Sequence, residues 1–157
     1  MKNTKILAVF FCLIFLIVAI FTKGFGLFKS NSAEPPFISD SDAFLSISLS
    51  EITSQAKWYE YDLGQEKIRF FVVRANDSSI RTAFNACDVC YRYKKGYRQE
   101  GDYMVCNNCG NRYPITSLGT ENKNPGGCWP GYLPNIIQGD NVLIKKSDLE
   151  NNRWRSL

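Results

Sequence analysis

Two Cys-x-x-Cys pairs are the residues of this chain best suited to chemistry. Cys87 and Cys90 form the first pair, Cys106 and Cys109 form the second pair fifteen residues later, and Cys128 follows after eighteen more. Each pair projects two sulfur atoms from one tight turn, and two such turns facing each other supply the four thiolates of a tetrahedral metal site. The chain contains no histidine, so a metal site built here relies on sulfur.

Sulfur ligands narrow the choice of metal but leave other chemistry open. Thiolates select zinc, iron in iron–sulfur clusters or monovalent copper, and they disfavour calcium and magnesium. Disulfides are the alternative in an oxidising compartment, although the five cysteines after residue 80 cannot all pair with one another. A redox Cys-x-x-Cys of the thioredoxin type would begin a helix in a βαβ unit, whereas strands and loops are expected here. The paired spacing therefore favours a metal site over disulfide chemistry.

Cys128 needs its own explanation, because four thiolates already complete a closed site. It lies in the segment NPGGCWPG, residues 124–131, whose proline and glycine content predicts a tight irregular loop. We predict that this loop folds over the two Cys-x-x-Cys turns and brings the Cys128 sulfur within reach of the site, either as an exchangeable ligand or as a thiol beside the ligands. The alternative is a buried cysteine in a remote loop.

The elements that position these cysteines are predicted to be mostly strands. Val, Ile and aromatic residues dominate segments with a period of two, and short polar turns separate them. A hairpin is expected where a four-residue turn joins two of these segments. Strands are predicted at residues 56–63, 67–75, 80–86, 102–106, 111–115 and 141–149, and only residues 42–55 suggest a helix. The expected class is a mostly β domain with long loops that carry the cysteines.

The amino-terminal region predicts a membrane anchor. Residues 6–21 carry no charge, Lys2 and Lys5 precede them, and no small-x-small cleavage site follows closely. We therefore expect an uncleaved transmembrane helix within residues 1–29, a Pro-containing linker at 30–42 and a metal-binding β domain at 43–157. A single segment of this kind predicts a single-pass membrane protein whose carboxy-terminal domain is extracytoplasmic.

Charge and residue content exclude two classes of function. The whole net charge of +4 comes from four lysines in the first 29 residues, and the remaining chain is balanced. A neutral domain gives no electrostatic basis for nucleic-acid binding. No nucleophile–base pair or general acid–base constellation is recognisable, so we expect no independent catalytic activity.

Three motifs carry a family resemblance. The segments CDVCY, VCNNCG and GGCWP, beginning at residues 87, 105 and 126, occur in the order found in the FtrD-like family of membrane iron–sulfur domains, and the chain resembles that family over residues 45–150. The resemblance implies an iron–sulfur cluster and one-electron transfer within a membrane redox or iron-transport complex.

The order of strands and cysteine loops is also similar to that of Rieske domains. This similarity predicts a small Rieske-like β-sandwich or barrel, although a true Rieske centre needs two histidine ligands. Three other functions stay open. One is a binding module held together by structural zinc, and another is a protein that captures and delivers copper or iron, with the fifth thiol passing the metal on. The third is a thiol–disulfide protein.

Overall fold

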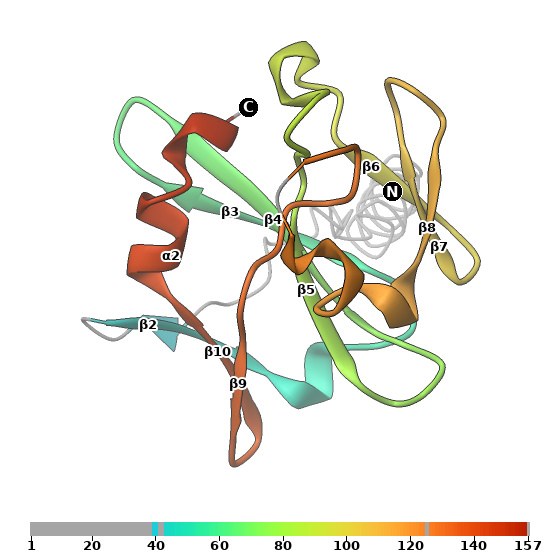
Figure 1. Ribbon diagram of the computed structural model, residues 1–157. Helices are drawn as coiled ribbons and strands as arrows, with labels where there is room; N and C mark the ends of the chain where they lie inside the picture. Colours follow the sequence, from blue (N-terminus) through green and yellow to red (C-terminus); the bar gives the residue numbers. More distant parts are fainter. Residues whose placement is uncertain (1–38, 41–42, 125, 157) are drawn as a thin grey trace, which may run out of the picture. The chain divides into compact units, whose positions relative to one another are not determined.

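The computed structural model describes residues 39–40, 43–124 and 126–156, whose strands form three small antiparallel sheets (Figure 1). The first sheet has the order β1-β2-β10-β9, the second β3-β4-β5 and the third β6-β7-β8. The strands are β1 (Ser39–Asp40), β2 (Phe44–Ser48), β3 (Lys57–Asp62), β4 (Lys67–Arg74), β5 (Ile80–Phe84), β6 (Tyr97–Glu100), β7 (Tyr103–Cys106), β8 (Arg112–Pro114), β9 (Ile136–Gln138) and β10 (Asn141–Lys145).

Helical structure is short in the described residues. The α-helix α2 (Lys146–Glu150) follows β10 directly. Five 3-10 turns complete the elements: η1 (Leu49–Glu51), η2 (Tyr91–Tyr93), η3 (Ile115–Ser117), η4 (Glu121–Lys123) and η5 (Arg153–Arg155). The prediction of a mostly β domain is therefore confirmed.

The central strand β4 separates two hydrophobic cores. Because successive side chains of a strand point to opposite faces, Phe71 and Val73 enter one core while Phe70 and Val72 enter the other. All four side chains have no exposed surface. The first core also contains Cys87, Cys90 and Cys106 and is closed by the β6-β7-β8 sheet, whereas the second packs against β2, β10 and α2. The cysteines thus lie in one wall of a packed core.

The predicted hairpin of residues 67–75 with residues 80–86 is present. β4 pairs with β3 and with β5, and residues 75–79 form the turn between β4 and β5. β7 pairs with β8 across the second Cys-x-x-Cys turn. The sequence did not predict β6, which pairs with β7 and places the segment between the two cysteine pairs in a sheet.

Two predicted elements are wrong. Residues 42–55 contain strand β2 in place of a helix, because Leu45 and Ile47 alternate with more exposed residues and pair with β10. The last strand ends at Lys145, four residues earlier than predicted. The alternation of buried side chains stops there, and Leu149 reaches the second core from α2.

The predicted membrane anchor lies outside the described residues, as does most of the linker. Ser39 and Asp40, which fall in the predicted linker, pair with β2 as strand β1. No helix of the described residues is long and apolar enough to cross a membrane. The transmembrane helix and the Rieske-like arrangement stay predictions.

Candidate metal centre

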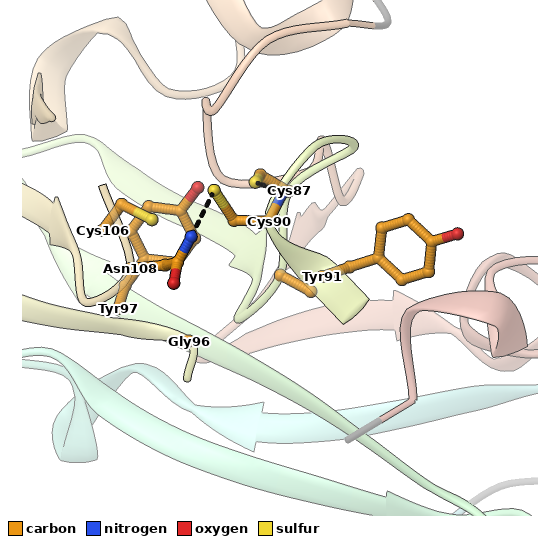
Figure 2. Close-up of a pocket in the computed structure, with 8 residues that line it drawn as sticks. Cys87, Cys90, Tyr91, Gly96, Tyr97, Cys106 and Asn108 are labelled. Carbon is orange, nitrogen blue, oxygen red and sulfur yellow. Dashed lines mark hydrogen bonds between the residues drawn. The ribbon is translucent and has the colours of Figure 1, made fainter. Parts of the chain in front are cut away.

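Three loops bring the cysteines together. Cys87 and Cys90 lie between β5 and η2, Cys106 ends β7, and Cys109 lies in the turn that leads to β8. Cys128 comes from the long loop between η4 and β9. In Figure 2 the side chains of Cys87, Cys90 and Cys106 lie around one small pocket, together with Tyr97 and Asn108, while the Tyr91 ring points away from the sulfur atoms.

Cys90 is the centre of the sulfur arrangement. The sulfur atoms of Cys87, Cys90 and Cys128 all lie within 4.8 Å of one another, and so do those of Cys90, Cys106 and Cys109. The Cys90 and Cys128 sulfurs are 3.4 Å apart. Four sulfurs around one zinc ion at Zn–S distances of about 2.3 Å would be about 3.8 Å apart, so each trio is close enough to hold a single ion. The predicted proximity of Cys128 is therefore found, and its role as a ligand stays a prediction.

Polar hydrogens point at the sulfur atoms, as they do in metal–thiolate sites. The backbone amide of Cys90 donates to the Cys87 sulfur at 2.9 Å. The side-chain amide of Asn108 lies 3.4 Å from the Cys90 sulfur, as the dashed line in Figure 2 shows. Gly110 has the positive φ of 76° expected for the turn, and its amide donates to the Cys106 carbonyl at 2.9 Å. The Cys90 and Asn108 amides thus direct polar hydrogens at sulfur, whereas the Gly110 amide closes the turn through a backbone carbonyl.

Burial acts against negative charge in two of the metal-free thiols, Cys106 and Cys128. Burial raises the pKa of Cys106 to about 11, and burial with contacts to Cys90 and Cys109 raises the pKa of Cys128 above its ordinary value. Burial also opposes ionisation of Cys109, but the Asn111 backbone amide and the neighbouring thiols outweigh it and lower the Cys109 pKa. A bound cation would reverse the repulsion among several thiolates, because each negative sulfur then gains an attractive partner.

Aromatic side chains close one side of the site. The Tyr97 hydroxyl donates to the Cys128 carbonyl, and burial raises the Tyr97 pKa far above its ordinary value. The rings of Tyr113 and Trp129 lie 4.6 Å apart between centroids. Of the tyrosines in this part of the sequence, Tyr97 and Tyr113 are buried next to the site, whereas Tyr93 is 59% exposed. The buried pair limits water access to the sulfurs.

The two Cys-x-x-Cys turns are fastened to each other. The backbone amide of Asn107 donates to the Gly96 carbonyl at 3.0 Å, and its side-chain amide donates to the Lys95 carbonyl at 2.9 Å. Asn85, which is 8% exposed, accepts the Tyr97 amide at 2.8 Å and packs directly on Gly96. These contacts hold the first loop against the second before any metal is considered.

A charged contact fixes the first cysteine loop to the chain end. Asp88, which lies between the two cysteines of the first pair, accepts hydrogen bonds from the Arg155 guanidinium and from the Gly126 backbone amide. Arg155 is 8% exposed and also donates to the Ala86 carbonyl at 3.3 Å. Sequence reasoning missed this residue, since nothing in the pattern of an arginine near the carboxy terminus indicates a partner 67 residues away.

The donor set fits a soft metal and offers nothing to a hard one. All five donor groups are sulfur, and three of them are buried. Cys109 is exposed and Cys128 is partly buried, so one side of the cluster is open to an approaching group. The small pocket lined by Cys87, Cys90 and Cys106 has a volume of about 10 Å³. Thiolate chemistry and spacing are thus compatible with an iron–sulfur cluster, zinc or copper.

The fold and the site define a small, mostly β domain whose loops gather five cysteines into one thiol cluster. A family model described as "Membrane iron-sulfur containing protein FtrD-like" matches residues 52–155, and the chain belongs to this family. The match confirms the resemblance derived from the cysteine motifs. No curated protein matches the chain.

Proposed function

We propose that this chain is a membrane-anchored protein whose cysteine cluster binds an iron–sulfur cluster and transfers single electrons for a membrane redox or iron-transport system. The observation that carries the proposal is the convergence of five sulfur atoms from three loops onto one partly open site. The family description adds iron–sulfur and membrane to that chemistry.

The residues divide into ligands and supports. Cys87, Cys90, Cys106 and Cys109 are the proposed obligatory ligands, and Cys128 is the proposed exchangeable ligand. An iron–sulfur cluster bound there supplies a reversible one-electron couple. Asn108 and the Cys90 amide hold negative charge on sulfur by hydrogen bonding, while the buried aromatic rings keep water from that side. Both features are ones that set the reduction potential of such sites.

Location and arrangement form the second part of the proposal. The uncharged run at residues 6–21 and the family description support a single-pass membrane protein with its carboxy-terminal domain outside the cytoplasm. The β6–β7 hairpin lies between the two Cys-x-x-Cys loops, which supports a Rieske-like layout with cysteine replacing histidine. A reporter that is active only outside the cytoplasm, fused after Leu157, should be active. An active cytoplasmic reporter would contradict the orientation.

The identity of the metal is tested by anaerobic purification of the full chain followed by metal analysis and a visible spectrum. We expect iron with acid-labile sulfide and visible absorption that decreases on reduction. Stoichiometric zinc without visible absorption would replace the proposal with the structural-zinc module.

Metal capture and delivery is a second candidate, favoured by the position of Cys90. This residue belongs to both sulfur trios. Each trio also contains one thiol that is more exposed than the others, Cys128 in one and Cys109 in the other. A soft ion could therefore exchange between trios through a shared ligand. Release of bound monovalent copper or ferrous iron to a competing chelator should slow markedly in Cys128→Ser if this candidate is correct. An unchanged rate would rule out transfer through Cys128.

A further inference from the structure

Exposed aromatic and basic side chains gather next to the first cysteine loop. The exposed fraction is 52% for Val89, 59% for Tyr93 and 45% for Trp154, values that are high for large apolar residues. Four exposed basic residues accompany them. We call this set the aromatic–basic patch, and its members are Val89, Tyr91, Arg92, Tyr93, Lys94, Lys95, Arg153 and Trp154.

Contacts between two distant segments make the patch continuous. The rings of Tyr91 and Trp154 meet edge to face with centroids 5.1 Å apart. Asp88 precedes Val89 and Arg155 follows Trp154 in the sequence, and a salt bridge joins Asp88 to Arg155. Figure 1 shows the turn that contains η2 near the carboxy-terminal end of the chain, in agreement with these contacts. The patch therefore belongs to one surface although its parts lie far apart in the sequence.

The charge of the patch is positive and is not neutralised within the fold. Residues 89–95 and 151–156 contain no Asp or Glu. Among the described residues, Arg92, Lys94, Lys95 and Arg153 form no ion pair. The other exposed arginines near the site behave differently, since Arg98 and Arg112 both pair with Glu100. A local positive surface thus stands out on a domain whose total charge is balanced.

We propose that the aromatic–basic patch docks on the anionic lipid headgroups of the membrane in which the chain is held. Trp and Tyr prefer the membrane–water interface because their rings are amphipathic, and Lys and Arg are attracted to negative headgroups. Charge complementarity and composition both select this occupant. An acidic protein would match the charge, but it would not by itself explain why tryptophan and tyrosine accompany the basic residues.

Docking in this way has a geometric consequence. The Cys87–Cys90 loop would face the lipid surface through Val89, and the domain would hold one orientation relative to the bilayer. The proposal rests on the patch and on the membrane anchoring proposed above, and it stands whichever metal the cysteines bind. Its strength depends on charge, because each Lys or Arg near an anionic surface strengthens binding by about fivefold.

The test uses the full chain in lipid nanodiscs whose lipids carry brominated acyl chains, which quench tryptophan that reaches the interface. Discs of phosphatidylcholine alone are compared with discs that also contain phosphatidylglycerol. The fluorescence of the Trp154→Phe variant comes from Trp58 and Trp129 alone. Subtracting it from the fluorescence of the unchanged protein gives the contribution of Trp154. We expect quenching of Trp154 in the anionic discs, less in the neutral discs, and a decrease with added salt because exposed charges are screened.

A charge variant and a matched control decide whether the patch is responsible. Replacing Arg92, Lys94 and Lys95 by Gln should weaken docking in anionic discs by about a hundredfold. The control replaces three exposed lysines elsewhere, Lys67, Lys123 and Lys145, by Gln and should leave Trp154 quenching unchanged. Equal Trp154 quenching in neutral and anionic discs, or equal loss in both triple variants, would overturn the proposal. Absence of quenching in every disc would also overturn it and leave the patch to an acidic protein.

Discussion

Arg155 offers the sharpest test of how the cysteine loop is held. Its side chain is 9% exposed, and it forms a salt bridge with Asp88, which lies between Cys87 and Cys90. The guanidinium also donates to the Asn152 side chain at 3.2 Å and lies 4.0 Å from the centroid of the Trp154 ring. Replacing Arg155 by Ala removes all of these contacts at once and leaves the Asp88 carboxylate without its positive partner.

The loss in the free energy of unfolding depends on how deeply the Arg155–Asp88 pair is buried. Removing one partner of a fully buried ion pair costs about 3–5 kcal/mol. The Asp88 side chain is 22% exposed and keeps its bond from the Gly126 amide, so the carboxylate is partly relieved. We therefore expect Arg155→Ala to lower the free energy of unfolding by about 3 kcal/mol. Asp88→Asn should cost about 2 kcal/mol, and the double variant should cost no more than Arg155→Ala plus about 1 kcal/mol.

The assay is urea unfolding of residues 35–157, which form one compact unit, followed by tryptophan fluorescence in the presence of a chelator. Working without metal separates the stability of the loop from the affinity of the site. Arg155→Lys keeps the positive charge but cannot make all of the guanidinium hydrogen bonds at once. It should therefore lower the free energy of unfolding by about 1 kcal/mol. Arg153→Ala is the matched control, because this exposed neighbour has no ion pair among the described residues and should change stability by less than about 0.5 kcal/mol.

The reasoning is refuted if the losses of unfolding free energy in the two single variants add up in the double variant. If Arg155→Ala and Asp88→Asn add in the double variant, the two side chains do not stabilise each other in solution. A cost of Arg155→Ala equal to that of Arg153→Ala would show that the chain end does not fasten the cysteine loop.

Three further predictions concern the site and the core. Cys87→Ser, Cys90→Ser, Cys106→Ser and Cys109→Ser should each abolish normal metal occupancy, whereas Cys128→Ser should keep the metal and change its spectrum, potential or release rate; full occupancy in Cys90→Ser would contradict the assignment. Gly96→Ala should destabilise the domain by about 1–3 kcal/mol more than Gly101→Ala, because both glycines have positive φ but only at Gly96 would a Cβ lie 2.4 Å from the Asn85 side chain. Equal urea midpoints for the two variants would show that Asn85 moves aside. Tyr59→Phe should stabilise the protein by about 1 kcal/mol, because the buried hydroxyl has no hydrogen-bond partner among the described residues. Burial raises the pKa of Tyr59 to about 12, so the unfolded chain ionises first and stability should fall as the pH rises from 10.0 to that value; the Phe variant should lose less in a pH series.

The sequence was sufficient for the features that depend on local pattern. Alternation of apolar and polar residues predicted β3, β4 and β5, and the hairpin of β4 with β5 followed from the four-residue polar turn between them. The cysteine spacing predicted that two turns would meet, and the composition around Cys128 predicted a covering loop. In each case the information lies within a few residues, where geometry leaves little choice.

Features that depend on distant partners were missed or wrong. β2 was assigned to a helical segment because its alternation covers only Phe44–Ser48, and its true partner β10 lies at the other end of the domain. β6 was missed because its burial pattern does not alternate, and pairing with β7 defines it. The bond between Arg155 and Asp88 spans 67 residues, so no local pattern records it. Tertiary contacts decided these cases over local propensity.

The sulfur geometry also changes how the opening motif is understood. Two Cys-x-x-Cys pairs suggest a symmetric site in which each pair contributes equally, yet the structure divides the sulfurs into trios that share Cys90. Cys87 is buried, whereas Cys109 is exposed, so the two pairs meet solvent differently. A bound metal would therefore be held from the core side by the first pair and approached from outside near Cys109 and Cys128. Cys128 belongs to the first trio, shares Cys90 with the second and is only partly buried, which is the arrangement that the proposed exchange requires.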